Sequence, residues 1–76
     1  MELIVSRIGT HAFLQFETDN TAPGYNIEVL DDQKKVVQKY KMVKKNFLLI
    51  NRLKSDEKYT LHIKNRNGDI VIRKKI

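Results

Sequence analysis

Alternation of apolar and polar residues with a period of two limits most strongly what this chain can fold into. Ala12, Leu14 and Phe16 are separated by single residues, and the segments 25–29 and 59–63 repeat that spacing. Successive side chains of a β-strand point to opposite faces, so this period predicts strands that are buried on one face and solvated on the other. No stretch of the sequence keeps a helical period, so we expect an all-β protein.

Turn-forming residues divide the alternating runs into seven segments. They recur about every ten residues, which is the spacing of an antiparallel sandwich or barrel. The predicted strands cover residues 2–8, 10–17, 25–30, 35–42, 47–51, 58–64 and 69–74. The loops include residues 19–24, the tight connection 31–34, the turn 44–46 and Asn67-Gly68, a pair that favours hairpins because both residues tolerate positive φ. Two sheets packed face to face would bury both apolar sides, and a small closed barrel would show the same alternation.

The length and composition predict one domain that covers residues 1–76. A chain this short buries only about 60% of its unfolded surface, so we expect marginal stability. Cysteine is absent from the sequence, so neither a disulfide nor a thiolate metal site is possible. No apolar run approaches the ~20 residues that a membrane span needs, and the first residues do not read as a signal peptide. The localisation stays open: virion or cytoplasm for a complete protein, extracellular for a domain taken from a longer one.

The segment 48–63 carries the most specific pattern in the chain. Leu53 precedes Tyr59 by six residues, and Tyr59 alternates with the aliphatic residues Leu61 and Ile63. This resembles the fifth and sixth strands of fibronectin type III domains. The resemblance implies a seven-stranded, antiparallel, immunoglobulin-like sandwich with a tyrosine corner, in which the Tyr59 hydroxyl bonds to the chain a few residues upstream. Phe16 stands where that family has a tryptophan.

The resemblance extends to the first three strands. It implies core positions for Leu3, Val5 and Ile8 in the first, and for the alternating apolar residues of 12–16 and 25–29 in the next two. A second likeness, carried by residues 29–37, 58–68 and 74–76, is to the C-terminal sorting domains of secreted Bacteroidota proteins. Those are small seven-stranded sandwiches too, so both likenesses imply the same fold and different functions.

Residues able to do chemistry are few and scattered. His11 and His62 both alternate away from the apolar face, and a metal site needs three or four ligands in fixed geometry. Asp31 and Asp32 have the ligand type that hard cations prefer, but acidic turn residues that bond their own backbone explain them better. The sequence shows no nucleophile–base pair and no phosphate loop. We therefore expect no enzymatic activity, no cofactor, no metal and no small-molecule substrate.

The charge of +6 is unevenly distributed along the chain. Residues 1–33 hold one base and six acids, whereas residues 34–76 hold fourteen bases and three acids. This asymmetry predicts a surface for an anionic partner. Its candidate residues are Lys39, Lys41, Lys44, Lys45, Lys64, Arg66, Arg73, Lys74 and Lys75. Lysines that keep sheet edges from pairing with other chains are the alternative explanation.

Exposed aromatic and aliphatic residues bear on the kind of partner. Proteins that bind single-stranded nucleic acid stack bases on aromatic rings. Only Tyr40 and Phe13 are candidates, because Tyr25, Tyr59, Phe16 and Phe47 are assigned to the core. Four apolar residues are expected on the outer faces of the sheets, namely Phe13, Leu30, Leu49 and Val71. Ile70 and Ile72 are expected to share the opposite face of the last strand from Val71.

The sequence thus favours a structural or protein-interaction module whose partners are proteins of a larger assembly. A phage virion component such as a capsid accessory protein is one setting, and a domain of a cell-surface or secreted protein is another. The alternatives are a small nucleic-acid-binding domain that uses the basic half of the chain, and a secretion sorting domain.

Overall fold

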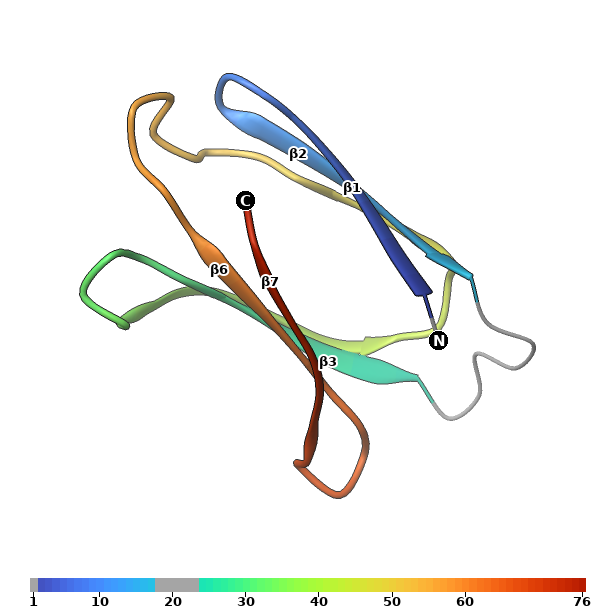
Figure 1. Cartoon of the computed structure of the whole chain (residues 1–76). Helices are drawn as coiled ribbons and strands as arrows, with labels where there is room; N and C mark the ends of the chain where they lie inside the picture. Colours follow the sequence, from blue (N-terminus) through green and yellow to red (C-terminus); the bar gives the residue numbers. More distant parts are fainter. Residues whose placement is uncertain (1, 18–23) are drawn as a thin grey trace.

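The chain forms two antiparallel β-sheets that lie one over the other (Figure 1). The computed structural model describes residues 2–17 and 24–76, and these residues contain seven strands and no helix. The strands are β1 (Glu2–Ile8), β2 (His11–Glu17), β3 (Tyr25–Leu30), β4 (Val36–Val43), β5 (Phe47–Ile50), β6 (Thr60–Lys64) and β7 (Ile70–Lys75). The all-β prediction and the seven strands are confirmed, with strand ends that differ by two residues at most. The loop predicted at 19–24 lies, except for its last residue, outside the described residues.

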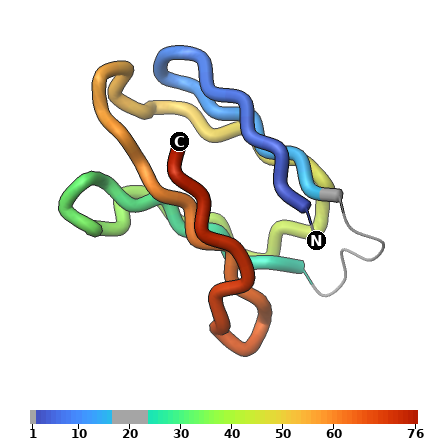
Figure 2. Tube along the Cα trace, viewed as in Figure 1, coloured from blue at the N-terminus to red at the C-terminus, as the bar shows by residue number. Residues whose placement is uncertain are grey.

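One sheet has the order β1-β2-β5 and the other the order β4-β3-β6-β7. The chain therefore passes between the sheets three times, from β2 to β3, from β4 to β5 and from β5 to β6, as the tube in Figure 2 shows. Strands β4 and β7 form the two edges of the four-stranded sheet, and β1 and β5 form the edges of the three-stranded sheet.

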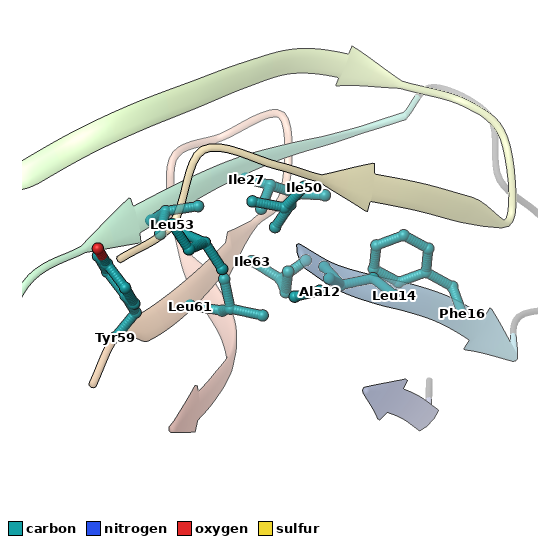
Figure 3. Close-up of a cluster of buried hydrophobic side chains, with 10 residues drawn as sticks. Ala12, Leu14, Phe16, Ile27, Ile50, Leu53, Tyr59, Leu61 and Ile63 are labelled. Carbon is teal, nitrogen blue, oxygen red and sulfur yellow. The ribbon is translucent and has the colours of Figure 1, made fainter. Parts of the chain in front are cut away.

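The inner faces of the two sheets supply one shared core. Ala12, Leu14 and Phe16 line up along β2, and Leu61 and Ile63 meet them from β6 (Figure 3). The cluster is completed by Ile27, Val29, Ile50, Leu53 and Tyr59. Seven of its side chains are fully buried, and the described part of the chain has no buried side-chain nitrogen or oxygen without a partner. The alternation seen in the sequence therefore corresponds to real burial.

Two hairpins of the four-stranded sheet turn on the same pattern of hydrogen bonds. In the β3–β4 turn, Asp31 Oδ1 accepts bonds from the backbone N–H groups of Gln33 and Lys35, both at 2.9 Å. In the β6–β7 turn, the Asn65 side-chain oxygen does the same for the residues two and four positions on, at 2.9 and 3.0 Å. The fourth residue of each turn has positive φ, Lys34 at 64° and Gly68 at 88°. The predicted hairpin at Asn67-Gly68 is confirmed, although only the glycine adopts positive φ.

Four residues differ from their predicted positions. Phe47 was expected in the core and is 47% exposed, because β5 is apolar on both faces and the ring lies on the outer one. Ile8 is 81% exposed at the end of β1 rather than in the core. A register shift between Ile63 and Lys64 sets Ile70 opposite Lys64, so Ile70 is also exposed. Leu30 was expected outside, but it is buried at the irregular β3–β4 pairing.

Candidate functional site

The outer face of the four-stranded sheet gathers positive charge, and we call it the cationic face. Strand pairing puts Lys39 of β4 opposite Glu28 of β3, Glu28 opposite His62 of β6, and His62 opposite Arg73 of β7. Directly opposite residues of paired strands share a face, so these four side chains form one row across the whole sheet. Neighbouring strands lie about 4.8 Å apart, which spaces the ends of the row by roughly 14 Å.

The surroundings of Glu28 and His62 agree with this shared face and add Lys64 to it. Lys64 lies two residues beyond His62 on β6, and its Nζ is 2.9 Å from Glu28 Oε1. His62 is half-buried between them, and burial is the main reason why the pKa of its imidazole lies below the ordinary value. The Arg73 and Lys64 charges lower that pKa further, and Glu28 opposes them. The neighbourhood of His62 is therefore electropositive despite the one carboxylate.

Alternation along β4 and β7 adds two more bases to the cationic face. Lys41 lies two residues from Lys39, and Lys75 lies two residues from Arg73 opposite Thr60; both are exposed. The cationic face thus consists of Lys39, Lys41, Lys64, Arg73 and Lys75, together with Glu28 and His62. Both edge strands of this sheet carry exposed bases, which also discourages pairing with foreign strands.

The remaining four residues predicted for the anionic-partner surface lie elsewhere. Lys44 and Lys45 occupy the connection between β4 and β5, and the Lys45 Nζ lies 5.8 Å from the centre of the Phe47 ring. Arg66 is exposed in the β6–β7 turn. Lys74 pairs with Leu61, so it belongs to the inner side of the edge strand. The structure therefore brings together five of the nine predicted bases.

Tyr59 lies where the chain crosses from the three-stranded to the four-stranded sheet. Its ring is 5% exposed and closes one end of the core next to Leu53, itself 3% exposed (Figure 3). The hydroxyl accepts a hydrogen bond of 2.9 Å from the backbone N–H of Lys54, five residues upstream. It also donates to Glu57 Oε2 at 3.2 Å. Both hydroxyl functions are thus satisfied inside the crossover.

Arg7 stabilises the same crossover, a role that sequence reasoning missed. Its guanidinium lies over the Tyr59 ring, 5.2 Å from the centre, and donates to the backbone oxygen of Lys54 at 2.6 Å. Further bonds of 3.3 Å reach the oxygens of Gly9 and Ile76. The signal in the sequence was that Arg7 follows Leu3 and Val5 at an inward position of the first strand. A charge at such a position needs a partner, because burying it unpaired would be costly.

A hollow of about 830 Å³ adjoins Tyr59 and Arg7 at this end of the molecule. It is lined by acids and bases that alternate, among them Asp31, Asp56 and Lys58, so it presents no charge of one sign to a ligand. Within residues 2–17 and 24–76, no three acidic or histidine side chains come together as metal ligands. Those residues also include no helix long and apolar enough to cross a membrane.

Tyr40, the second aromatic candidate for stacking, is not available to a base. It is half-buried against the core, and its hydroxyl donates to the Gln38 side chain. Burial raises the pKa of the Tyr40 phenol, and the nearby Arg52 charge partly offsets that rise. Gln38 in turn donates to the backbone oxygen of Asn51 at 2.8 Å, which links the edge of one sheet to the other.

Comparison of the chain with protein-family models, with curated protein sequences and with solved structures finds no match.

Proposed function

We propose that this domain is a non-enzymatic interaction module built on an immunoglobulin-like sandwich of the fibronectin type III kind. In immunoglobulin constant domains, one sheet consists of the first, second, fifth and fourth strands, and the other sheet consists of the third, sixth and seventh strands. In this chain β1, β2 and β5 also share one sheet, and β3, β6 and β7 share the other. The difference is β4, which pairs with β3 instead of β5. The buried Tyr59, bonded to a backbone group upstream, supports the same assignment.

The partner that we propose is an acidic protein surface, and it docks on the cationic face. The row from Lys39 to Arg73 is the observation that carries this proposal. Charge arranged on one side of a small module steers association and selects partners of opposite sign. These bases lie on the two edge strands, β4 and β7, and on the inner strand β6. The sheet holds them in fixed positions, so the face is a preformed surface rather than a flexible tail.

Protein fits this face better than single-stranded nucleic acid does. Base stacking needs exposed aromatic rings, and the chain has six aromatic residues, all of them described. Phe13 and Phe47 lie on the outer face of the other sheet, and the remaining four pack in or against the core. The four-stranded sheet instead exposes apolar side chains near its bases, with Val37 45% and Val71 46% exposed. A mixture of apolar and basic side chains is suited to a protein partner.

The test is a binding titration with a fluorescent Glu-rich peptide at low and physiological salt. We expect salt-dependent binding, with an affinity that falls roughly tenfold or more in Lys39→Glu/Arg73→Glu. Reversing the two positive charges at the ends of the row turns attraction of the acidic peptide into repulsion. A matched control, Lys34→Glu/Lys58→Glu, changes the net charge equally at exposed positions away from the cationic face and keeps most of the affinity.

Three outcomes would contradict the proposal. Absence of binding at low salt, or an equal loss in both double variants, would mean that the face is only a solvated surface. A DNA duplex that binds more tightly than the peptide, with a steeper dependence on salt, would favour the nucleic-acid function instead.

A further inference from the structure

The outer face of the three-stranded sheet is apolar, and we call it the apolar face. Four large side chains are about half exposed on it: Ile4 at 49%, Phe13 at 44%, Phe47 at 47% and Leu49 at 53%. The Phe13 and Phe47 rings stack with their centres 6.1 Å apart and their planes 19° apart. A contiguous apolar patch on a small domain marks an interaction surface.

Strand pairing places Ile4 and Phe47 symmetrically about β2, and Leu49 opposite Phe13. Ile4 of β1 and Phe47 of β5 both pair with Gln15, so they flank β2 at the same level. β1 and β5 run in the same direction, because each is antiparallel to the strand between them. Two residues earlier in the chain than this pair stand Glu2 on one side and Lys45 on the other. An acid and a base thus flank the same end of the apolar face.

Charge decides what can cover the apolar face. Of the outward residues of β1, β2 and β5 whose side chains are described, Glu2 is the only Asp, Glu, Lys or Arg, and His11 is the one other ionisable residue. Two copies of a chain with a net charge of +6 repel each other wherever their basic residues meet. They can approach through the apolar face, because the cationic faces then lie on opposite outer sides of the pair.

We propose that a second copy of this chain covers the apolar face and forms a symmetric dimer. A two-fold axis parallel to β2 exchanges the β1 side of one copy with the β5 side of the other. Phe13 then meets Phe13 of the second copy on the axis, and Ile4 meets Phe47 of the second copy. Glu2 meets Lys45 of the second copy, so two ion pairs border one end of the contact. The interface is self-complementary, as two-fold symmetry requires.

The experiment is sedimentation equilibrium of the full chain over a wide concentration range. We expect a monomer–dimer equilibrium, and about hundredfold or greater weakening in Phe13→Glu, which places two like charges against each other on the axis. Val71→Glu is the matched control, because Val71 is equally exposed at 46% but lies on the other sheet. It leaves the dimer unchanged. Leu49→Lys provides a second disruptive variant, and circular dichroism verifies that each variant is folded.

A charge exchange tests the orientation of the two copies. Glu2→Lys and Lys45→Glu each weaken the dimer, and the double variant restores it, because the ion pairs reform with their signs reversed. A chain that stays monomeric at the highest concentration, or a Phe13→Glu variant that dimerises like the parent, would overturn the proposal. A double variant that stays as weak as the single ones would overturn the axis along β2. None of these readouts depends on the acidic peptide, so the two proposals fail separately.

Discussion

The two sheets of this domain are alike inside and different outside. Both inner faces carry aliphatic residues that alternate with outward ones, and together they form one core. Outside, the four-stranded sheet presents bases in register, whereas the three-stranded sheet presents Ile4, Phe13, Phe47 and Leu49. The inner faces determine the fold, because they bury the apolar area that stabilises it. The outer faces are free of that requirement, so their contrast points to function.

The contrast also separates the two kinds of partner. A cationic surface gains little from apolar contact and loses affinity as salt rises, whereas an apolar surface depends on area and shape. Placed on opposite sides of a sandwich, the two surfaces can be occupied at the same time. A dimer through the apolar face would therefore display two cationic faces, and two linked contacts bind a multivalent partner more tightly than one.

The first and largest prediction tests whether the inner faces are equivalent. Leu14 and Leu61 are fully buried and come from opposite sheets. We expect Leu14→Ala and Leu61→Ala each to lower the free energy of unfolding by about 2–5 kcal/mol, because each leaves a cavity in the same core. Chemical denaturation of dilute protein measures both. Leu49→Ala, on the apolar face, should change the stability of the monomer by less than about 0.5 kcal/mol.

Unequal results would break the comparison. If one of the two buried leucines could be truncated without loss, the sheets would not share one cooperative core.

The second prediction concerns the crossover that joins the two sheets. Tyr59→Phe removes the oxygen that accepts the Lys54 N–H, and it leaves that donor without its partner in a part-buried place. We expect stability to fall by about 1–3 kcal/mol, as for other buried groups left unpaired. Thermal denaturation followed by circular dichroism measures this loss.

Tyr40→Phe is the control for the second prediction. Its hydroxyl bonds a side chain that can turn toward water, so we expect a smaller loss, about 0.5–1.5 kcal/mol. Equal stability of Tyr59→Phe and the parent would show that the crossover does not depend on the hydroxyl.

The sequence predicts the inner faces well and the outer faces poorly, for a physical reason. Inward positions require apolar side chains, so buried residues such as Leu14, Ile27 and Leu61 alternate with polar residues in the sequence. The segment 47–50 is apolar at every position and therefore shows no alternation. Its sequence does not indicate which side of the strand is buried, and the position predicted for Phe47 was wrong. Irregular pairing in β3–β4 and β6–β7 changed the exposure expected for Leu30 and Ile70, and single-sequence periodicity does not reveal such shifts.

The cationic face shows the same limit. Composition predicts that the second half of the chain is basic, but only strand pairing reveals which bases lie together. Lys39 and Arg73 are 34 positions apart in the sequence and share a row, whereas Lys74, next to Arg73, belongs to the inner side. The bonds of Arg7 to three backbone oxygens were equally invisible, because they depend on where distant loops meet.

The third prediction, with the smallest effect, uses His62 to distinguish the two faces by pH. Its pKa is lowered by burial and then by Arg73 and Lys64, against the opposing effect of Glu28. Lys39 completes the row on the far side of Glu28. Because the folded pKa lies below the unfolded one, the unfolded chain binds more protons below about pH 6.5, and stability falls as the pH drops through that value.

An anionic partner on the cationic face has the opposite effect on this histidine. It favours the protonated ring and raises the pKa, so binding and proton uptake are linked. We expect affinity for the Glu-rich peptide to rise roughly twofold to tenfold between about pH 7.5 and 5.5, where the Glu carboxylates of the peptide remain largely ionised. His62→Gln should remove this rise, and His11→Gln, exposed at the start of β2, should keep it. Protonation of His62 should not change dimerisation through the apolar face, since that residue lies on the opposite sheet. A pH dependence that survives in His62→Gln would mean that the peptide is bound away from the row.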